Sequence, residues 1–356
     1  MSSTTKTLTT TLLAAAASLA LLTGTAGPTA GASSGTPHSS SPQPASTTAA
    51  AQPSAGSMPT ALSAGCGTEQ KPGNDEKTIT TADGERSFRI NIPRDYEIAT
   101  PLPLVLGFHG NGSDGAEFQN YTGLPQLPAI TVFPDGDLND GKRSWQGAPY
   151  ASGADDVAFV ADLLDEVESE HCIDLNRIFA TGKSNGGGMV SVLACHLRDR
   201  FSAFAPVAGA YYPQSTEGCD YSIPTPMLAI HGTGDATMHY DGGHRQGEDY
   251  PSVRDWIRPW ADASDCEKET ERQVGRKGED VVRTQWTQCG AGSHSAVKPG
   301  RSAAVELYSV ADGGHVWPGE LVYSGGGYVT KDFSATDTIW DFFLSHPGAT
   351  QGPDQK

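Results

Sequence analysis

The sequence predicts an α/β fold in which helices flank a mostly parallel central sheet on both faces. Five short runs are almost entirely apolar, as is typical of strands buried on both faces of a parallel sheet. These runs are Leu104–Phe108, Ala129–Phe133, Arg177–Thr181, Ala203–Val207 and Met227–Ile230. Segments with helical periodicity lie between them, so strand and helix alternate along the chain, which indicates the α/β class.

The remaining elements complete this pattern. Apolar residues recur at steps of three and four between Val157 and Val167, so Ala154–Glu170 is expected to be an amphipathic helix. Further helices are expected at Gly186–Leu197, Ser252–Ala261 and Ser334–Leu344. Alternation of polar and apolar residues predicts a half-exposed strand near a sheet edge at Arg86–Ile92. Two later strands are expected at Val281–Thr287 and Ala303–Val310.

Residues 1–26 have the layout of a secretory signal peptide. Lys6 gives a positively charged start, the apolar run Leu12–Leu22 follows, and small residues then lead to a cleavage site after Ala26. This run is too short to span a membrane. We therefore expect a secreted, extracellular protein with no membrane partner.

Composition divides the rest of the chain. Residues 27–65 are almost all Ala, Ser, Thr, Pro and Gly, which is typical of a disordered linker because such residues bury little apolar surface. Residues 66–347 are expected to form a single catalytic domain, followed by a polar tail at 348–356. The sequence does not indicate an oligomeric state.

Charge excludes some classes of partner. The net charge is −18, and Lys6 is the only charged side chain before Cys66, so the remainder carries about −19. Nucleic acids and anionic membranes are therefore not expected as partners, because phosphate binding requires clustered Lys and Arg. A hydrophobic content of 37% excludes global disorder.

Six cysteines follow the linker. They are Cys66, Cys172, Cys195, Cys219, Cys266 and Cys289. An even number in an exported protein predicts three disulfides, and the spacing is unlike that of a zinc site. Only the pair Cys266–Cys289 is proposed from the sequence, because the strand Val281–Thr287 can fold back on the preceding segment.

Ser184 is the candidate nucleophile. It lies in Gly182-Lys-Ser-Asn-Gly186, which matches G-x-S-x-G, directly after one predicted strand and before one predicted helix. A second match, Gly31-Ala-Ser-Ser-Gly35, lies in the linker and lacks this context. A phosphate-binding loop would need a glycine at position 177, which is occupied by arginine.

A serine hydroxyl needs a base and an acid that orients the base. In a strand–turn–helix serine site the acid follows the nucleophile in sequence and the histidine comes last. Asp235 lies just after the strand Met227–Ile230, and His315 lies in a glycine-rich loop after Ala303–Val310. Asp241 is the reserve acid, and the rival histidines are His231, His239 and His244.

The oxyanion donors are expected to be backbone N–H groups. One belongs to Asn185, the residue after the nucleophile. The other is assigned to Asn111, with Gly110 as the alternative, in the loop that ends the strand Leu104–Phe108. His109 in the same loop has either a supporting or a purely structural role.

Several motifs in order resemble those of secreted feruloyl esterases and, more broadly, the polyhydroxybutyrate-depolymerase-type esterases. The motifs are Phe108-His-Gly, Phe133-Pro-Asp-Gly136, Asp155-Asp-Val-Ala-Phe-Val160, Asn176-Arg-Ile-Phe-Ala-Thr-Gly-Lys-Ser-Asn-Gly-Gly187 and Gly313-Gly-His-Val-Trp-Pro318. The similarity extends from Ala64-Gly-Cys-Gly67 to Ile339-Trp-Asp-Phe-Phe343. It implies an α/β-hydrolase fold, catalysis by Ser184, Asp235 and His315, and no cofactor or metal.

The resemblance also implies the substrate class. We expect a serine esterase that releases ferulate from arabinoxylan, with acetylxylan or polyhydroxybutyrate as alternative substrates and a non-catalytic polysaccharide-binding protein as a remote alternative. Trp145 and Trp317 are interpreted as loop aromatics that either stack on a phenolic ring or sugar or pack under a loop. Lys183 replaces the apolar residue that often precedes the nucleophile in such enzymes. Its side chain is expected to point to solvent; the alternative is an ammonium that reaches the cleft, where it alters proton transfer between serine and histidine or favours an anionic substrate.

Overall fold

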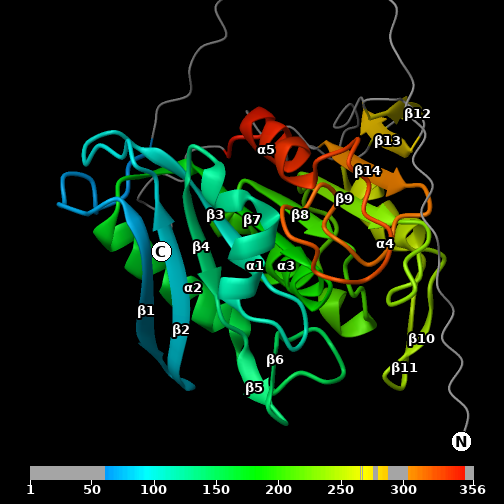
Figure 1. The fold of residues 1–356 in the computed structure, drawn as a ribbon, viewed down its shortest axis with the longest axis horizontal. Helices are drawn as coiled ribbons and strands as arrows, with labels where there is room; N and C mark the ends of the chain where they lie inside the picture. Colours follow the sequence, from blue (N-terminus) through cyan, green and yellow to red (C-terminus); the bar gives the residue numbers. More distant parts are fainter. Residues whose placement is uncertain (1–60, 265, 267, 276–279, 288–303, 349–356) are drawn as a thin grey trace, which may run out of the picture. The chain divides into compact units, whose positions relative to one another are not determined.

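The structure is a computed structural model that describes residues 61–264, 266, 268–275, 280–287 and 304–348 (Figure 1). The predicted signal peptide, most of the predicted linker and residues 349–356 of the tail lie outside this part of the chain. Among the described residues, no helix combines the length and hydrophobicity needed to cross a membrane.

A ten-stranded sheet forms the centre of the described part, in the order β1-β2-β4-β3-β7-β8-β9-β14-β13-β12. The strands are β1 (Gly73–Thr81), β2 (Gly84–Ile92), β3 (Leu102–Phe108), β4 (Ile130–Pro134), β7 (Ile173–Lys183), β8 (Ala203–Val207), β9 (Met227–Gly232), β12 (Lys268–Val274), β13 (Val281–Thr287) and β14 (Val305–Val310). Neighbours from β4 to β14 pair in parallel, whereas β1, β2, β13 and β12 pair antiparallel at the two ends. The predicted α/β class with a mostly parallel sheet is therefore confirmed.

Helices cover both faces of this sheet (Figure 1). The helices are α1 (Gly115–Thr122), α2 (Asp156–Glu170), α3 (Asn185–His196), α4 (Val253–Ala263) and α5 (Ala335–Ser345). One core contains residues of α2, α3 and α4, and the other contains residues of α1 and α5. Neighbouring residues of β7 point to opposite faces, so Ile178 joins the first core while Phe179 stacks on Phe343 of α5 with ring centroids 4.5 Å apart.

Short hairpins and 3-10 turns lie between these strands and helices. Two hairpins pair β5 (Asp137–Asn139) with β6 (Lys142–Ser144) and β10 (Gly243–Arg245) with β11 (Glu248–Tyr250). Three 3-10 turns lie at Leu124–Gln126, Arg198–Arg200 and Pro213–Thr216. These elements, together with α1, β1 and β12, were not predicted, because each is short or too polar to show a clear hydrophobic period.

The domain begins before Cys66, which corrects the predicted linker boundary. Ser63 is buried, its N–H donates to the Ile173 carbonyl at 3.0 Å, and its hydroxyl donates to the His171 carbonyl at 2.5 Å. Leu62 forms an isolated bridge with Asp174. Residues 61–63 therefore pair with the start of β7, and the Gly65 N–H donates to the Glu168 carbonyl of α2, so these hydrogen bonds hold a segment of low hydrophobicity in the domain.

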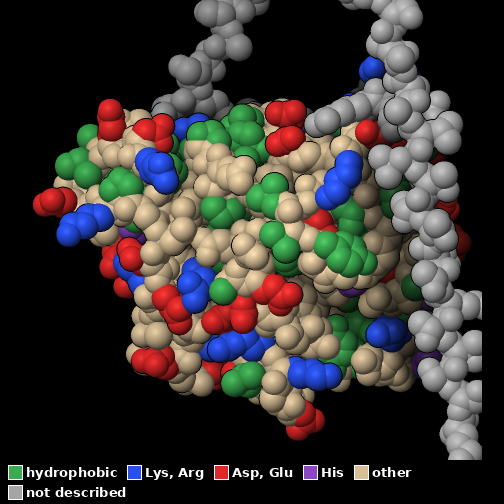
Figure 2. Space-filling model, viewed as in Figure 1, with side chains coloured by type: hydrophobic (Ala, Val, Ile, Leu, Met, Phe, Trp, Pro, Cys, Tyr) green, Lys and Arg blue, Asp and Glu red, His purple; other side chains and the backbone are tan. Residues whose placement is uncertain are grey.

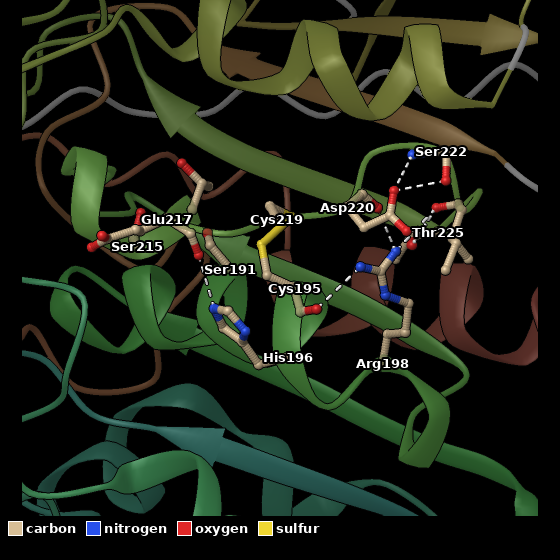
Figure 3. Close-up of a disulfide and its surroundings, with 12 residues drawn as sticks. Ser191, Cys195, His196, Arg198, Ser215, Glu217, Cys219, Asp220, Ser222 and Thr225 are labelled. Carbon is tan, nitrogen blue, oxygen red and sulfur yellow. Dashed lines mark hydrogen bonds between the residues drawn. A yellow bond between two sulfur atoms is a disulfide. The ribbon is translucent and has the colours of Figure 1, made fainter.

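Two of the predicted disulfides are present, Cys66–Cys172 and Cys195–Cys219. Cys266 is disulfide-bonded as well, and the pairing predicted for it ends on Cys289, which lies outside the described residues. The second bond joins the C-terminal end of α3 to the segment after Pro213–Thr216, close to hydrogen bonds from Arg198 to the carbonyls of Asp220 and Cys195 (Figure 3).

Removal of this bond should lower stability without abolishing activity. Its sequence separation of 24 residues corresponds to about 3 kcal/mol in the chain-entropy account. We therefore expect Cys195→Ala/Cys219→Ala to lower the melting temperature by roughly 5–8 °C, measured by thermal unfolding. The wild type under reducing conditions provides the comparison, and an unchanged melting temperature in the variant would contradict the prediction.

Candidate active site

Ser184 lies in a strained turn between β7 and α3. It is the N-cap of α3 with φ of 59° and ψ of −121°, a backbone conformation that residues with a Cβ rarely adopt. A Cβ on Gly186 would lie 2.1 Å from the Phe108 carbonyl oxygen, and one on Gly182 would lie 2.5 Å from the Gly186 oxygen. Both flanking glycines are therefore required for the close contact between this turn and β3, which forms the nucleophile elbow that the motif predicted.

The helix after Ser184 differs from the other helices. Asp114, Asp155, Ser252 and Ser334 cap α1, α2, α4 and α5 through their side chains. The Ser184 side chain makes no such cap bond to α3. The first N–H groups of a helix lack intrahelical acceptors and carry partial positive charge, so the start of α3 favours an anion beside Ser184.

Asp235 and His315 form a buried hydrogen-bonded pair. His315 Nδ1 lies 2.8 Å from Asp235 Oδ2, and the Asp235 side chain is fully buried. The other carboxylate oxygen, Oδ1, accepts the backbone N–H groups of Thr237 and Met238, each at 2.8 Å. Asp235 follows β9 and His315 follows β14, as the sequence predicted, and the structure shows that these two strands are parallel neighbours.

Burial and hydrogen bonding set the charge of this pair. Burial alone raises the pKa of Asp235, but hydrogen bonds from His231 and His315 outweigh it and hold that pKa well below its ordinary value. The pKa of His315 is lowered, mainly by burial, against the opposing effect of Asp235. The carboxyl group is thus ionised and the imidazole neutral near pH 7, which is the state that a general base requires.

All three predicted catalytic residues lie at the same edge of the sheet. Ser184, Asp235 and His315 follow β7, β9 and β14, and the strands β7, β8, β9 and β14 are successive neighbours. The positive charge of Lys183, the residue before Ser184, is among the causes that lower the pKa of His315.

The loop after β3 lies directly against the nucleophile. A Cβ on Gly110 would lie 3.3 Å from the Ser184 Cβ, and the next residue, Asn111, is exposed. Asn185, the second predicted oxyanion donor, is buried at the start of α3. The assignment of the Asn111 and Asn185 N–H groups as oxyanion donors therefore remains a prediction that this arrangement accommodates.

Within the described ranges, no group of three or more His, Cys, Asp or Glu side chains is arranged to hold a metal ion.

Comparison with known proteins indicates the family to which the chain belongs. The chain is similar to a probable feruloyl esterase C of Aspergillus niger, with 28% identity over 80% of this chain and 92% of the relative. Feruloyl esterase C of Emericella nidulans gives the same identity and coverage, and feruloyl esterase B of Piromyces equi is 27% identical over 72% of this chain and 44% of its own length. The chain is an α/β-hydrolase of the feruloyl esterase type.

A family model supports the same fold around the nucleophile. Residues 141–222 match the prolyl oligopeptidase family, and this segment contains Ser184 and α3. Together with the relatives, the match shows that the protein is a serine carboxylic ester hydrolase. The predicted resemblance to feruloyl esterases is confirmed.

Trp145 and Trp317 of this esterase are not exposed aromatics. Both indoles are fully buried, so neither presents a face on which a phenolic ring or sugar can stack. Trp317 Nε1 donates to the Thr336 hydroxyl at 2.9 Å, and Trp145 Nε1 donates to the His109 carbonyl at 3.0 Å. The alternative of packing under a loop is correct for both, because each indole N–H finds an internal acceptor.

Trp145 is hydrogen-bonded to Asn185, the residue after the candidate nucleophile. Its backbone N–H donates to Asn185 Oδ1 at 2.7 Å, and its carbonyl accepts from Asn185 Nδ2 at 3.1 Å. His109 Nδ1 lies 2.7 Å from the Gly110 carbonyl, and its Nε2 accepts the Gly136 N–H at 2.9 Å. These contacts fix both predicted oxyanion segments, which gives His109 a supporting role that the motif alone did not distinguish from a structural one.

The rival acid and base residues have other positions. His231 is buried with Nε2 3.3 Å from Asp235 Oδ2, so it supports the acid from a second side. His244 is exposed and pairs with Asp249 in the β10–β11 hairpin. The His239 N–H donates to the Tyr250 hydroxyl at 3.1 Å, and Asp241 is exposed. His315 is the histidine whose Nδ1 bonds the buried acid.

The expectation that Lys183 points to solvent is wrong. The residue is only 7% exposed, and its Nζ donates to the Ser324 hydroxyl at 3.1 Å. No sequence pattern indicates this contact, because Ser324 lies 141 positions later in a loop after β14.

Proposed function

We propose that this esterase is exported and releases ferulate from feruloylated arabinoxylan in the plant cell wall. The observation that carries the proposal is the Asp235–His315 pair at the same sheet edge as the strained Ser184, in a chain aligned along 80% of its length with a probable feruloyl esterase. The two disulfides between described cysteines support an oxidising compartment, as export requires.

The proposed reaction proceeds through an acyl-enzyme. His315 Nε2 takes the proton of the Ser184 hydroxyl as its oxygen attacks the ester carbonyl carbon, and Asp235 stabilises the imidazolium. Backbone N–H groups of Asn111 and Asn185 bind the oxyanion of the tetrahedral intermediate. The intermediate collapses as His315 gives its proton to the sugar oxygen, which leaves as an alcohol. Water then attacks the acyl-enzyme by the same route and releases the acid.

The surface fits a polysaccharide better than a polyanion. Figure 2 shows acidic and basic side chains interspersed over one face of the molecule, with hydrophobic groups between them. Four exposed large hydrophobic residues lie in the loop after His315: Leu321, Val322, Tyr323 and Tyr328. Tyrosine rings and aliphatic groups bind the apolar faces of sugars and phenolic rings, whereas a nucleic acid would require a basic surface.

Acetylxylan and polyhydroxybutyrate remain the alternative substrates, and one panel separates them. The panel contains methyl ferulate, a short p-nitrophenyl ester, acetylated xylan and a polyhydroxybutyrate film. We expect kcat/KM for methyl ferulate to exceed that for the p-nitrophenyl ester at least tenfold, with ferulate released from arabinoxylan. Hydrolysis confined to the acetyl or polyester substrates would overturn the ferulate assignment, and binding without any acid release would favour the non-catalytic alternative.

A further inference from the structure

A buried cation lies one residue before the nucleophile. Lys183 is the last residue of β7, and its Nζ donates to Ser324 Oγ at 3.1 Å and lies 5.3 Å from the centre of the Tyr121 ring in α1. A buried ammonium is costly unless it is paired or hydrogen-bonded. An apolar side chain at position 183 would avoid that cost, so the lysine is expected to have a function there.

The counter-charge of Lys183 is reached through Ser324. The Ser324 hydroxyl donates to Glu320 Oε2 at 2.7 Å, and the Ser324 N–H donates to Glu320 Oε1 at 2.9 Å. Glu320 is itself only 3% exposed. The Leu321 N–H also donates to the Tyr121 carbonyl at 2.9 Å. The ammonium, the hydroxyl and the carboxylate thus form one continuous polar connection between β7 and residues 319–331. We call residues 319–331 the histidine loop, because this loop follows His315 and is hydrogen-bonded to it.

The histidine loop holds His315 by its backbone. The His315 N–H donates to the Gly326 carbonyl at 2.7 Å, and the Gly314 N–H donates to the Tyr328 carbonyl at 2.9 Å. A Cβ on Gly326, whose φ is 98°, would lie 2.3 Å from the His315 carbonyl oxygen. The loop therefore packs on the base as closely as a glycine allows, and a displacement of the loop displaces His315.

We propose that Lys183 is a positioning residue that ties the nucleophile turn to the histidine loop through Ser324 and Glu320, and so fixes Ser184 relative to His315. The proposal rests on the serine mechanism proposed above. Lys183 aligns the base with the nucleophile and does not contact the substrate.

The charge of Lys183 provides a second readout. Burial is the largest cause that lowers the pKa of His315, Asp235 opposes it, and the positive charge of Lys183 and the electrostatic effect of the nearby His231 lower it further. Burial also lowers the pKa of Lys183, against the opposing effects of Glu320, Asp235 and Glu117. Removal of the ammonium should therefore raise the pKa of His315, and the acidic limb of the activity profile should move to higher pH.

The test compares Lys183→Met, Lys183→Arg and Ser324→Ala, with hydrolysis of a short p-nitrophenyl ester measured between pH 4 and 9. Lys183→Met should lower kcat about 10- to 100-fold and move the acidic limb of kcat/KM up by about half a pH unit. Ser324→Ala breaks the connection but keeps the charge, so it should lower kcat about threefold to tenfold and leave the limb in place. Lys183→Arg keeps the positive charge, so the acidic limb of kcat/KM should stay at its wild-type pH.

The controls separate this proposal from the mechanism on which it rests. Wild-type kcat and an unshifted acidic limb in folded Lys183→Met would overturn the positioning role. Activity retained by Ser184→Ala in the same assay would instead remove the serine mechanism. If Lys183→Met does not fold, the double variant Lys183→Met/Glu320→Gln removes both buried charges together, and a wild-type profile in that variant would also overturn the proposal.

Discussion

Replacement of Ser184 by alanine should lower kcat/KM for methyl ferulate by about 10⁴- to 10⁶-fold. The variant loses the oxygen that forms the acyl-enzyme, while Asp235 and His315 retain their hydrogen bond. The measurement is initial-rate hydrolysis, with trapping of the acyl-enzyme by mass spectrometry as a second readout. Residual turnover should come only from the backbone donors and bound water.

The fold of this variant should be intact, because the backbone of residue 184 is held without the hydroxyl. Its N–H donates to the Val207 carbonyl at 3.1 Å, and its carbonyl accepts the N–H groups of Gly188 and Ala210 at 3.0 and 2.8 Å. Ser184→Gly should be as inactive as Ser184→Ala. Its free energy of unfolding should be about 1 kcal/mol higher than that of Ser184→Ala, since glycine adopts a φ of 59° without strain.

The chain offers a matched control for this experiment. Ser33 occupies the serine position of the second G-x-S-x-G match, Gly31-Ala-Ser-Ser-Gly35. Ser33→Ala should keep wild-type activity, because the sequence directly before this match has no apolar run of the kind that precedes Gly182. Loss of activity in Ser33→Ala, or substantial turnover by Ser184→Ala, would show that the wrong serine has been assigned.

The sequence predicted the parts of the site that depend on strand order. Apolar runs located β3, β4, β7, β8 and β9 within a few residues. Parallel strands end at one edge of a sheet, so a serine, an aspartate and a histidine that follow β7, β9 and β14 are brought to that edge by topology alone. The acid and the base of the proposed mechanism meet there, with His315 Nδ1 2.8 Å from Asp235 Oδ2.

The sequence did not predict which way individual side chains point. Trp145 and Lys183 stand in segments that a pattern places near the surface, yet both are buried. Their partners, the His109 carbonyl and the Ser324 hydroxyl, lie in other loops. Such contacts depend on loop conformations set by long-range packing, which hydrophobic periodicity does not encode.

Asp235→Asn should lower kcat/KM by about 10⁴-fold while His315 stays in place. Oδ1 accepts two backbone N–H groups, so the asparagine carbonyl oxygen should take that position and the new amide should face His315 Nδ1. An amide N–H donates where the carboxylate accepted, which forces the hydrogen of His315 onto Nε2. The imidazole then presents an N–H to Ser184 and is unable to take its proton. Initial rates on methyl ferulate measure the loss.

The control is Asp241→Asn, which removes the same charge from an exposed position six residues later. Its activity should stay within about twofold of the wild type, because an exposed charge is screened by solvent. Asp235→Asn should also have a lower free energy of unfolding than the wild type at neutral pH. The pKa of Asp235 is lowered in the folded state, so its ionised form stabilises the fold above the unfolded-state pKa. This contribution is lost as pH falls through the folded-state pKa. The difference in melting temperature between Asp235→Asn and the wild type should therefore narrow on acidification. An equal loss of activity in both variants would assign the effect to net charge and remove Asp235 from the mechanism.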